Sequence, residues 1–128
     1  MFSHIMVGAN DVEASRRFYD AVLGALGVGP SWGDPKGRYW WRTDRGMFAI
    51  AAPMDGQPAT PANGGTIGFH AKDAEAVTAA HDAGVAAGGT SIEDPPGRRE
   101  GGFGPLQLAY LRDPAGNKIC LLHRIKEN

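Results

Sequence analysis

Apolar and polar positions follow two similar patterns along the chain of 128 residues. Each pattern opens with a short apolar run that ends at an aspartate, Asp11 in the first half and Asp73 in the second (73 − 11 = 62). A stretch with helical periodicity follows each aspartate, whose carboxylate is suited to cap the free amides of a first helical turn. A repeat offset of 62 residues indicates two copies of one supersecondary unit.

The first copy is predicted to contain a strand, a helix and a hairpin. Its apolar helical residues, such as Phe18, Tyr19 and Val22, gather on one side, so the helix is expected to cover a sheet. The aromatic run at residues 39–41 and the turn at 44–46 favour a pair of strands. The predicted elements are strands over 2–9, 38–43 and 47–52 and a helix over 12–26.

The second copy is predicted to repeat this order after a linker. Residues 53–65 contain three prolines, three glycines and no apolar periodicity, which is typical of a connection between units. The predicted elements of the second copy are a helix over 74–87, strands over 66–71, 106–112 and 118–123, a loop over 93–105 and a turn over 113–117.

Composition and charge narrow the classes of function. Lysine and arginine total 13 and aspartate and glutamate 14, for a formal net charge of −1, so no nucleic-acid partner is expected. No apolar run is long enough for a bilayer, and the first residues lack the pattern of a secretory signal, so no membrane association is expected. The chain has one cysteine, Cys120, so it cannot form an intramolecular disulfide. We therefore expect it in a reducing cytoplasm.

Two segments carry a resemblance to a known family. Residues 4–7 (HIMV) with 11–24 (DVEASRRFYDAVLG), and residues 112–122 (RDPAGNKICLL), resemble the first strand and helix and the closing turn and strand of the vicinal oxygen chelate superfamily. This superfamily includes glyoxalase I, bleomycin-resistance proteins and extradiol dioxygenases. The resemblance implies a single α+β domain over 1–128, in which two βαβββ modules (about 1–55 and 66–125, with a linker at about 53–65) form a half-open β cup. It also implies a homodimer.

The same resemblance implies four inward positions that hold a divalent metal in many members. By the repeat offset and an alignment of Gly46 with Gly116, these positions are His4, Ile50, Thr66 and Cys120. Isoleucine has no donor atom and threonine is a poor ligand, whereas a catalytic metal site needs about three imidazole or carboxylate ligands. We therefore expect no cofactor and no standard glyoxalase I activity, with a weakly bound divalent metal as the remaining alternative.

Several side chains are candidates for a ligand site in the cup. Strand alternation places His70 on the same face as Thr66, while His123 is out of phase with Cys120 and is expected to face away. Aromatic rings suit a flat or apolar ligand, and an arginine of the loop 98–100 can bind a ligand carboxylate. Each candidate also has a structural interpretation, as a packed or hydrogen-bonded wall residue. The candidates are His4, Trp41, Thr66, His70, Tyr110 and Cys120.

Three hypotheses of function remain open from the sequence. The first is a small-molecule-binding protein of the bleomycin-resistance kind with a degenerate metal site. The second is a lyase-like or dioxygenase-like enzyme that uses a metal or acid/base site built from His4, His70 and Cys120. The third is an interaction protein with a collapsed cup. The missing donors at Ile50 and Thr66 favour the first hypothesis, while His70 supports the second.

Overall fold

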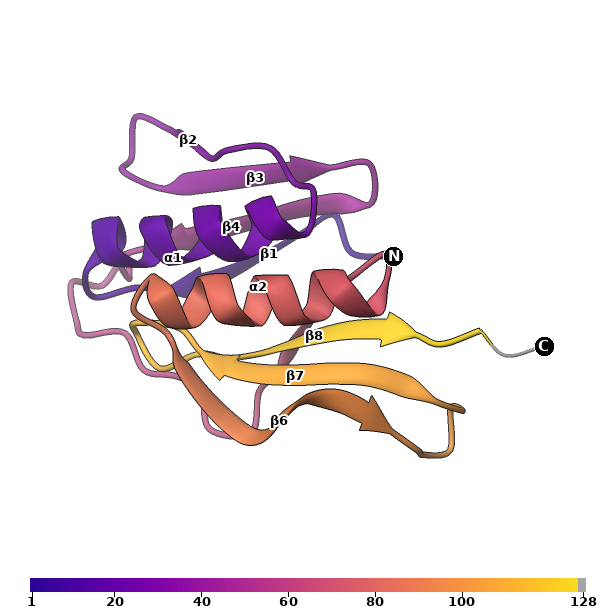
Figure 1. Ribbon diagram of the computed structural model, residues 1–128. Coiled ribbons are helices and arrows are strands. Elements are labelled where there is room, and N and C mark those ends of the chain that lie inside the picture. The colour runs from indigo at the N-terminus through magenta and orange to yellow at the C-terminus, as the bar shows by residue number, and fades with distance from the viewer. Residues whose placement is uncertain (127–128) are drawn as a thin grey trace.

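A computed structural model describes residues 1–126 of the chain and contains two helices and eight strands in two similar halves (Figure 1). The first half runs β1 (His4–Gly8), α1 (Val12–Ala25), β2 (Trp32–Gly33), β3 (Tyr39–Thr43) and β4 (Gly46–Ala51). The second half runs β5 (Ile67–His70), α2 (Ala74–Ala86), β6 (Thr90–Arg99), β7 (Leu106–Arg112) and β8 (Lys118–Arg124).

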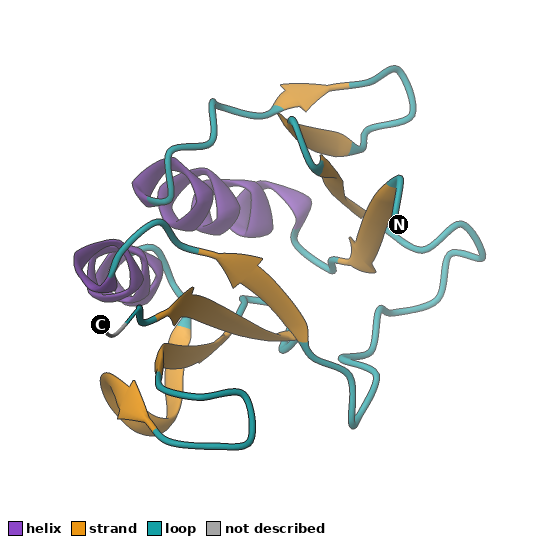
Figure 2. Cartoon of the chain, turned by 90° about the vertical axis from the view of Figure 1, so that its right-hand side faces the viewer, coloured by secondary structure: helices purple, strands orange, loops and turns teal. Residues whose placement is uncertain are grey.

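Each half forms its own four-stranded sheet with the same topology. The strand orders are β1-β4-β3-β2 and β5-β8-β7-β6, and in each sheet the first strand pairs in parallel with the last while the other pairs are antiparallel. Both helices lie on one side of the two sheets (Figure 2). The predicted α+β fold of two βαβββ modules is therefore confirmed. Neither α1 nor α2 has the length and apolar character needed to cross a bilayer.

The two helices begin with equivalent caps. The Asp11 carboxylate accepts a hydrogen bond from the Ala14 amide at 3.0 Å, and the Asp73 carboxylate accepts one from the Ala76 amide at 2.8 Å. Each bond satisfies an amide that has no partner within its own helix. The repeat seen in the sequence thus corresponds to a repeated local structure.

One hydrophobic core joins the modules. It contains Phe18, Tyr19 and Val22 of α1 together with residues of both sheets and of α2. The helices approach closely at Gly84, where a Cβ atom would lie 2.7 Å from a Leu111 methyl carbon and 2.8 Å from a Val22 methyl carbon. A larger residue at this position would push α1 and α2 apart.

A buried hydrogen-bond network also connects the modules. The Tyr19 hydroxyl of α1 donates to Asp113 Oδ2 at 2.6 Å, and Asn117 Nδ2 donates to the same oxygen at 2.8 Å and to the Gly8 carbonyl at 2.9 Å. The amides of Ala115 and Asn117 donate to Asp113 Oδ1. The closing turn of the second module is therefore fixed to the end of β1.

The residue pattern did not locate two of the strands that two βαβββ modules require. The short β2 has only two residues, too few for a periodic pattern. Strand β6 occupies part of the predicted loop 93–105, and its pairing with β7 is interrupted between Ile92 and Gly97, around Pro95 and Pro96. Because β6 is an edge strand with a bulge, it tolerates prolines that would disrupt a central strand. The loop prediction was wrong for this reason.

Candidate functional site

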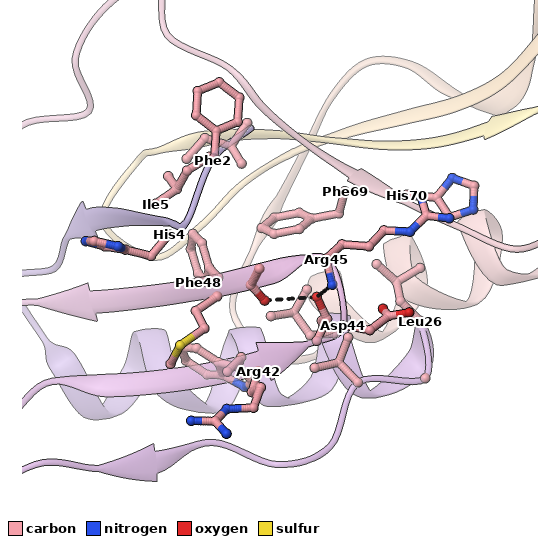
Figure 3. Close-up of a pocket in the computed structure, with 18 of the residues that line it drawn as sticks. Phe2, His4, Ile5, Leu26, Arg42, Asp44, Arg45, Phe48, Phe69 and His70 are labelled. Carbon is pink, nitrogen blue, oxygen red and sulfur yellow. Dashed lines mark hydrogen bonds between the residues drawn. The ribbon is translucent and has the colours of Figure 1, made fainter.

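A cavity of about 650 Å³ opens at the seam between the two modules (Figure 3). Its walls come from four segments: the start of β1, the C-terminal end of α1, the β3–β4 hairpin and β5. We call it the seam pocket. Its volume lies within the range of small-molecule sites. The lining residues are Phe2, His4, Ile5, Leu23, Leu26, Gly27, Val28, Gly29, Trp41, Arg42, Thr43, Asp44, Arg45, Gly46, Met47, Phe48, Ile67, Gly68, Phe69 and His70.

The inner wall of the seam pocket is apolar and is shared by both modules. The rings of Phe48 from the first module and Phe69 from the second lie 5.2 Å apart at 87°, an edge-to-face contact. Leu23 and Leu26 of α1 and its following turn add aliphatic surface. Such a wall favours a ligand with a ring or a hydrocarbon chain.

The mouth of the seam pocket is polar and carries an excess of cationic groups. Arg42, Asp44 and Arg45 come from the β3–β4 hairpin, and His70 comes from the end of β5 (Figure 3). Thr43 stabilises the hairpin turn, because its hydroxyl donates to the Gly46 carbonyl and accepts from the Arg45 amide. The turn that carries Arg45 is therefore held by its own hydrogen bonds.

The different lengths of two hairpin turns explain why the seam is open at this end. In the second module, five residues (113–117) join β7 to β8, and Asn117 reaches the backbone of Gly8. The position equivalent to Gly8 in the repeat is His70 (70 − 8 = 62). In the first module only Asp44 and Arg45 join β3 to β4. This shorter turn has no equivalent of Asn117, so the space beside His70 stays open as part of the seam pocket.

The sequence candidates divide between different parts of the structure. His4, Trp41 and His70 line the seam pocket. Thr66 lies instead at a smaller cavity of about 160 Å³ together with Arg112 and Lys118. Tyr110 and Cys120 pair directly across β7 and β8 and line neither cavity.

Trp41 takes part in the core rather than facing an open sheet surface. Its side chain is 1% exposed, packs with Tyr19 and Phe48, and donates from Nε1 to Asp20 of α1 at 2.9 Å. The neighbouring Trp40 points to the opposite face, where its ring lies 5.8 Å from that of His4. The indole edge of Trp41 reaches the seam pocket from the core side.

The sheet register corrects one of the four positions that we assigned to a metal. Cys120 pairs with Gly68, and the repeat equivalent of Gly68 is Met6, which pairs with Ala49. Ala49, not Ile50, is therefore the counterpart of Cys120. Ile50 is the next residue along β4, so its side chain points to the other face of the sheet. There it is fully buried in the core.

The residues at these positions do not fit a divalent metal. Alanine or isoleucine supplies no donor on β4, and Thr66 precedes β5 beside the smaller cavity. Among residues 1–126, no group of three or more histidine, cysteine, aspartate or glutamate side chains is placed to hold a metal ion. This set of side chains therefore gives no support to a metal-dependent reaction step at the inherited positions.

The surroundings of Cys120 favour its protonated form. Burial raises the pKa of its thiol, and this effect is only partly opposed by the hydrogen bond from Tyr110. Lys118, the nearby cation, forms a salt bridge with Glu93 at 2.5 Å and stacks over the Tyr110 ring. This environment is that of a packed thiol and not of an activated nucleophile.

Other polar residues form structural contacts away from the seam pocket. His123 Nδ1 lies 3.1 Å from the Ala71 carbonyl oxygen, and Arg99 donates to the carbonyls of Asp94 and Pro95 in the β6 bulge. Neither residue lines the seam pocket, and the same holds for Arg98 and Glu100. The arginines at the pocket mouth are instead Arg42 and Arg45, and the sequence context of Arg45 indicates only a turn.

The sequence analysis also missed a hydrogen-bonded group of three side chains around a buried histidine. His81 of α2 is 8% exposed, and its ring nitrogens lie 2.8 Å from Ser91 Oγ and 3.0 Å from Asp82 Oδ1. Ser91 belongs to the edge strand β6 and lines neither cavity. These hydrogen bonds therefore connect α2 to β6, and sequence spacing gives no sign of them because ten residues separate Ser91 from His81.

The fold and the pocket define a class of small α+β proteins with paired βαβββ modules. The model of the Glyoxalase/Bleomycin resistance protein/Dioxygenase superfamily matches residues 1–121. The chain therefore belongs to this superfamily. No curated protein sequence gives a significant match.

Solved structures share the fold along nearly the whole chain. A glyoxalase/bleomycin resistance protein from Albidiferax ferrireducens T118 is 57% identical, with a TM-score of 0.94 over 97% of this chain and 99% of that one. A glyoxalase-related enzyme from Fulvimarina pelagi (21% identity, TM-score 0.72, 97% and 88% covered) is more distant. So is a lactoylglutathione lyase from Agrobacterium tumefaciens (20%, 0.65, 95% and 92%). The last two likenesses concern the fold alone.

Proposed function

We propose that this chain is a small-molecule-binding protein with a degenerate metal site, and that its ligand occupies the seam pocket. The observation that carries the proposal is the apolar cavity of about 650 Å³, whose walls come from both modules. Its inner wall consists of core side chains that are already packed, such as Leu23, Trp41 and Phe48. A ligand would therefore enter a largely preformed site, at a low cost in side-chain ordering.

The alternative of an enzyme with a site built from His4, His70 and Cys120 has weaker support. His4 and His70 both line the seam pocket, but Cys120 does not, and its thiol is protonated. His4 Nδ1 is 2.8 Å from the Ser3 hydroxyl, and its ring contacts Trp40. This arrangement supports a role for His4 as a hydrogen-bonded wall residue rather than as a catalytic base.

We also propose that the chain pairs as a homodimer. Strands β1 and β5 each pair on one side only, so each has a free edge along the seam. Free strand edges are usually covered, and the first module adds exposed apolar side chains at Phe2, Met6 and Trp32. Sedimentation equilibrium tests this, with a mass of two chains expected and a mass of one chain contradicting it.

A titration with N-phenyl-1-naphthylamine, a neutral aromatic dye, tests the binding function. The blocking variant is Gly29→Phe, because Gly29 lines the seam pocket and a Cβ atom there has no heavy atom within 4 Å. The matched control is Gly101→Phe, at an exposed loop glycine that has equally open surroundings and does not line the pocket. We expect saturable binding by the parent and the control and at least a tenfold loss in Gly29→Phe. Equal binding by all three proteins would overturn the proposal.

A further inference from the structure

We propose that the ligand of the seam pocket is an amphipathic anion, an aromatic or acyl carboxylate or a compound of the same charge and shape, and that Arg45 binds its anionic group. This inference rests on the proposed binding function and adds the chemical class of the ligand. It combines two features of the pocket, the apolar inner wall and the cationic mouth. The two features would face the two ends of the same molecule.

In the part of the chain that the structure describes, Arg45 has no salt bridge, in contrast to Arg16 and Arg38 of the same module. Arg16 forms salt bridges with Glu13 and Asp20, and Arg38 forms one with Asp34. Within residues 1–126, the Arg45 guanidinium has no salt bridge to a carboxylate, although its backbone is fixed by Thr43. A planar guanidinium that lies at a pocket mouth without an acidic partner is suited to bind a carboxylate through two parallel hydrogen bonds.

The other charged groups at the mouth also favour a negatively charged ligand. Arg42 also lines the pocket, with its guanidinium placed over the Trp32 ring at 5.5 Å, so it adds positive charge without pointing to the ligand. His4 and His70 also line the pocket and add polar ring nitrogens. Asp44 is the one carboxylate among the lining residues. The mouth therefore carries a net positive charge that favours an anion.

The C-terminal end of α1 lies in the same pocket, and the negative end of its dipole disfavours an anion at that point. Three of its carbonyls already accept hydrogen bonds, because the amide of Leu26 donates to the carbonyls of Val22 and Leu23, and the Gly27 amide donates to that of Gly24. The Val28 amide also donates to the Leu23 carbonyl. The aliphatic side chains of this segment thus form part of the apolar wall, and the anionic group would contact Arg45 rather than the end of α1.

A comparison of two dyes with the same ring system tests the preference for an anion independently of the ability to bind a ligand. The probes are 8-anilinonaphthalene-1-sulfonate, which is anionic, and N-phenyl-1-naphthylamine, which is neutral. We expect the parent protein to bind the anionic dye at least tenfold more tightly. Arg45→Gln should remove about tenfold or more of that affinity, as loss of a charge-assisted hydrogen bond does, and should change the affinity for the neutral dye less than twofold. Arg45→Lys should retain part of the preference.

The matched control is Arg17→Gln, which removes an exposed arginine of α1 that does not line the pocket. It should leave both affinities unchanged. If both dyes bind equally well and Arg45→Gln changes neither, the anion inference is wrong while the binding function stands. If neither dye binds, the proposed function and the inference fail together. Binding of the anionic dye that survives both Gly29→Phe and Arg45→Gln would place it outside the seam pocket and would also overturn the inference.

Discussion

The Tyr19 hydroxyl donates a 2.6 Å hydrogen bond to the Asp113 carboxylate, and this contact joins the first helix to the last turn of the chain, 94 residues later. Asp113 is only 4% exposed, so its side-chain oxygens need the hydrogen-bond donors that surround them. Burial, together with the Asp113 carboxylate, raises the pKa of the Tyr19 hydroxyl and keeps it protonated as a donor. The network closes one end of the seam between the modules, whereas the seam pocket occupies the other.

Tyr19→Phe should destabilise the fold by about 1–3 kcal/mol, because a buried carboxylate oxygen loses one of its two side-chain donors. Urea denaturation of both proteins measures the difference. The matched control is Tyr39→Phe, which removes a hydroxyl bonded at 2.6 Å to the exposed Glu13 and should cost much less. Equal losses for the two substitutions would show that the Tyr19–Asp113 bond has no special role.

The rate at which iodoacetamide alkylates Cys120 should rise with pH toward a midpoint above that of an ordinary cysteine. Burial raises the pKa of this thiol, so the reactive thiolate forms only at higher pH. The same shift favours the folded state below the thiol pKa of the unfolded chain, and that contribution is lost as the pH rises through the folded value. The chain unfolded in urea provides the reference profile. A midpoint below that of the unfolded chain would contradict this prediction and would support Cys120 as a nucleophile.

Protein purified without a metal-affinity tag should contain divalent metal well below one ion per chain. It should also fail to isomerise the hemithioacetal of methylglyoxal and glutathione. The reason is the absence of donors at Ala49 and Ile50 and the poor donor at Thr66. Elemental analysis and an isomerase assay check both parts. One tightly bound zinc, nickel or iron per chain, with His4 among its ligands, would contradict this prediction.

His70→Ala should weaken the binding of 8-anilinonaphthalene-1-sulfonate, and His123→Ala should not. His70 lines the mouth of the seam pocket, whereas His123 contacts the Ala71 carbonyl and lies outside it. A hydrogen bond from His70 to the charged group would contribute about 1.5–3 kcal/mol to binding. Isothermal titration calorimetry measures the affinity of both variants and of the parent protein for this dye. Indistinguishable affinities would assign His70 to the wall of the sheet without a role in recognition.

The sequence predicted the modules because their determinants are local. The caps at Asp11 and Asp73, the helical periodicity and the two hairpin turns all act within a few residues. The bulged edge strand β6 was missed because its pairing with β7 overrides the local preference of Pro95 and Pro96. Tertiary contact decided this element, and no pattern within residues 93–105 shows it.

The candidate site was predicted only in part, for a similar reason. Strand alternation indicates that neighbouring residues such as Trp40 and Trp41 face opposite sides, but it does not say which side each one takes. The register of β4 with β3 settles that choice, and its register with β1 replaces Ile50 by Ala49. Arg45 became a candidate only when the hairpin was placed beside β5, because its distance in sequence from His70 conceals their common pocket.

A crystal structure of the protein with bound 8-anilinonaphthalene-1-sulfonate would show whether the seam pocket is a site for amphipathic anions. We expect the rings of the dye to lie between Phe48 and Leu26 in the seam pocket and the sulfonate to contact the Arg45 guanidinium. A dye bound on the open face of the sheets, beside Trp40 or Tyr110, with the seam pocket filled by solvent or by a second copy of the chain, would contradict both the binding site and the role of Arg45.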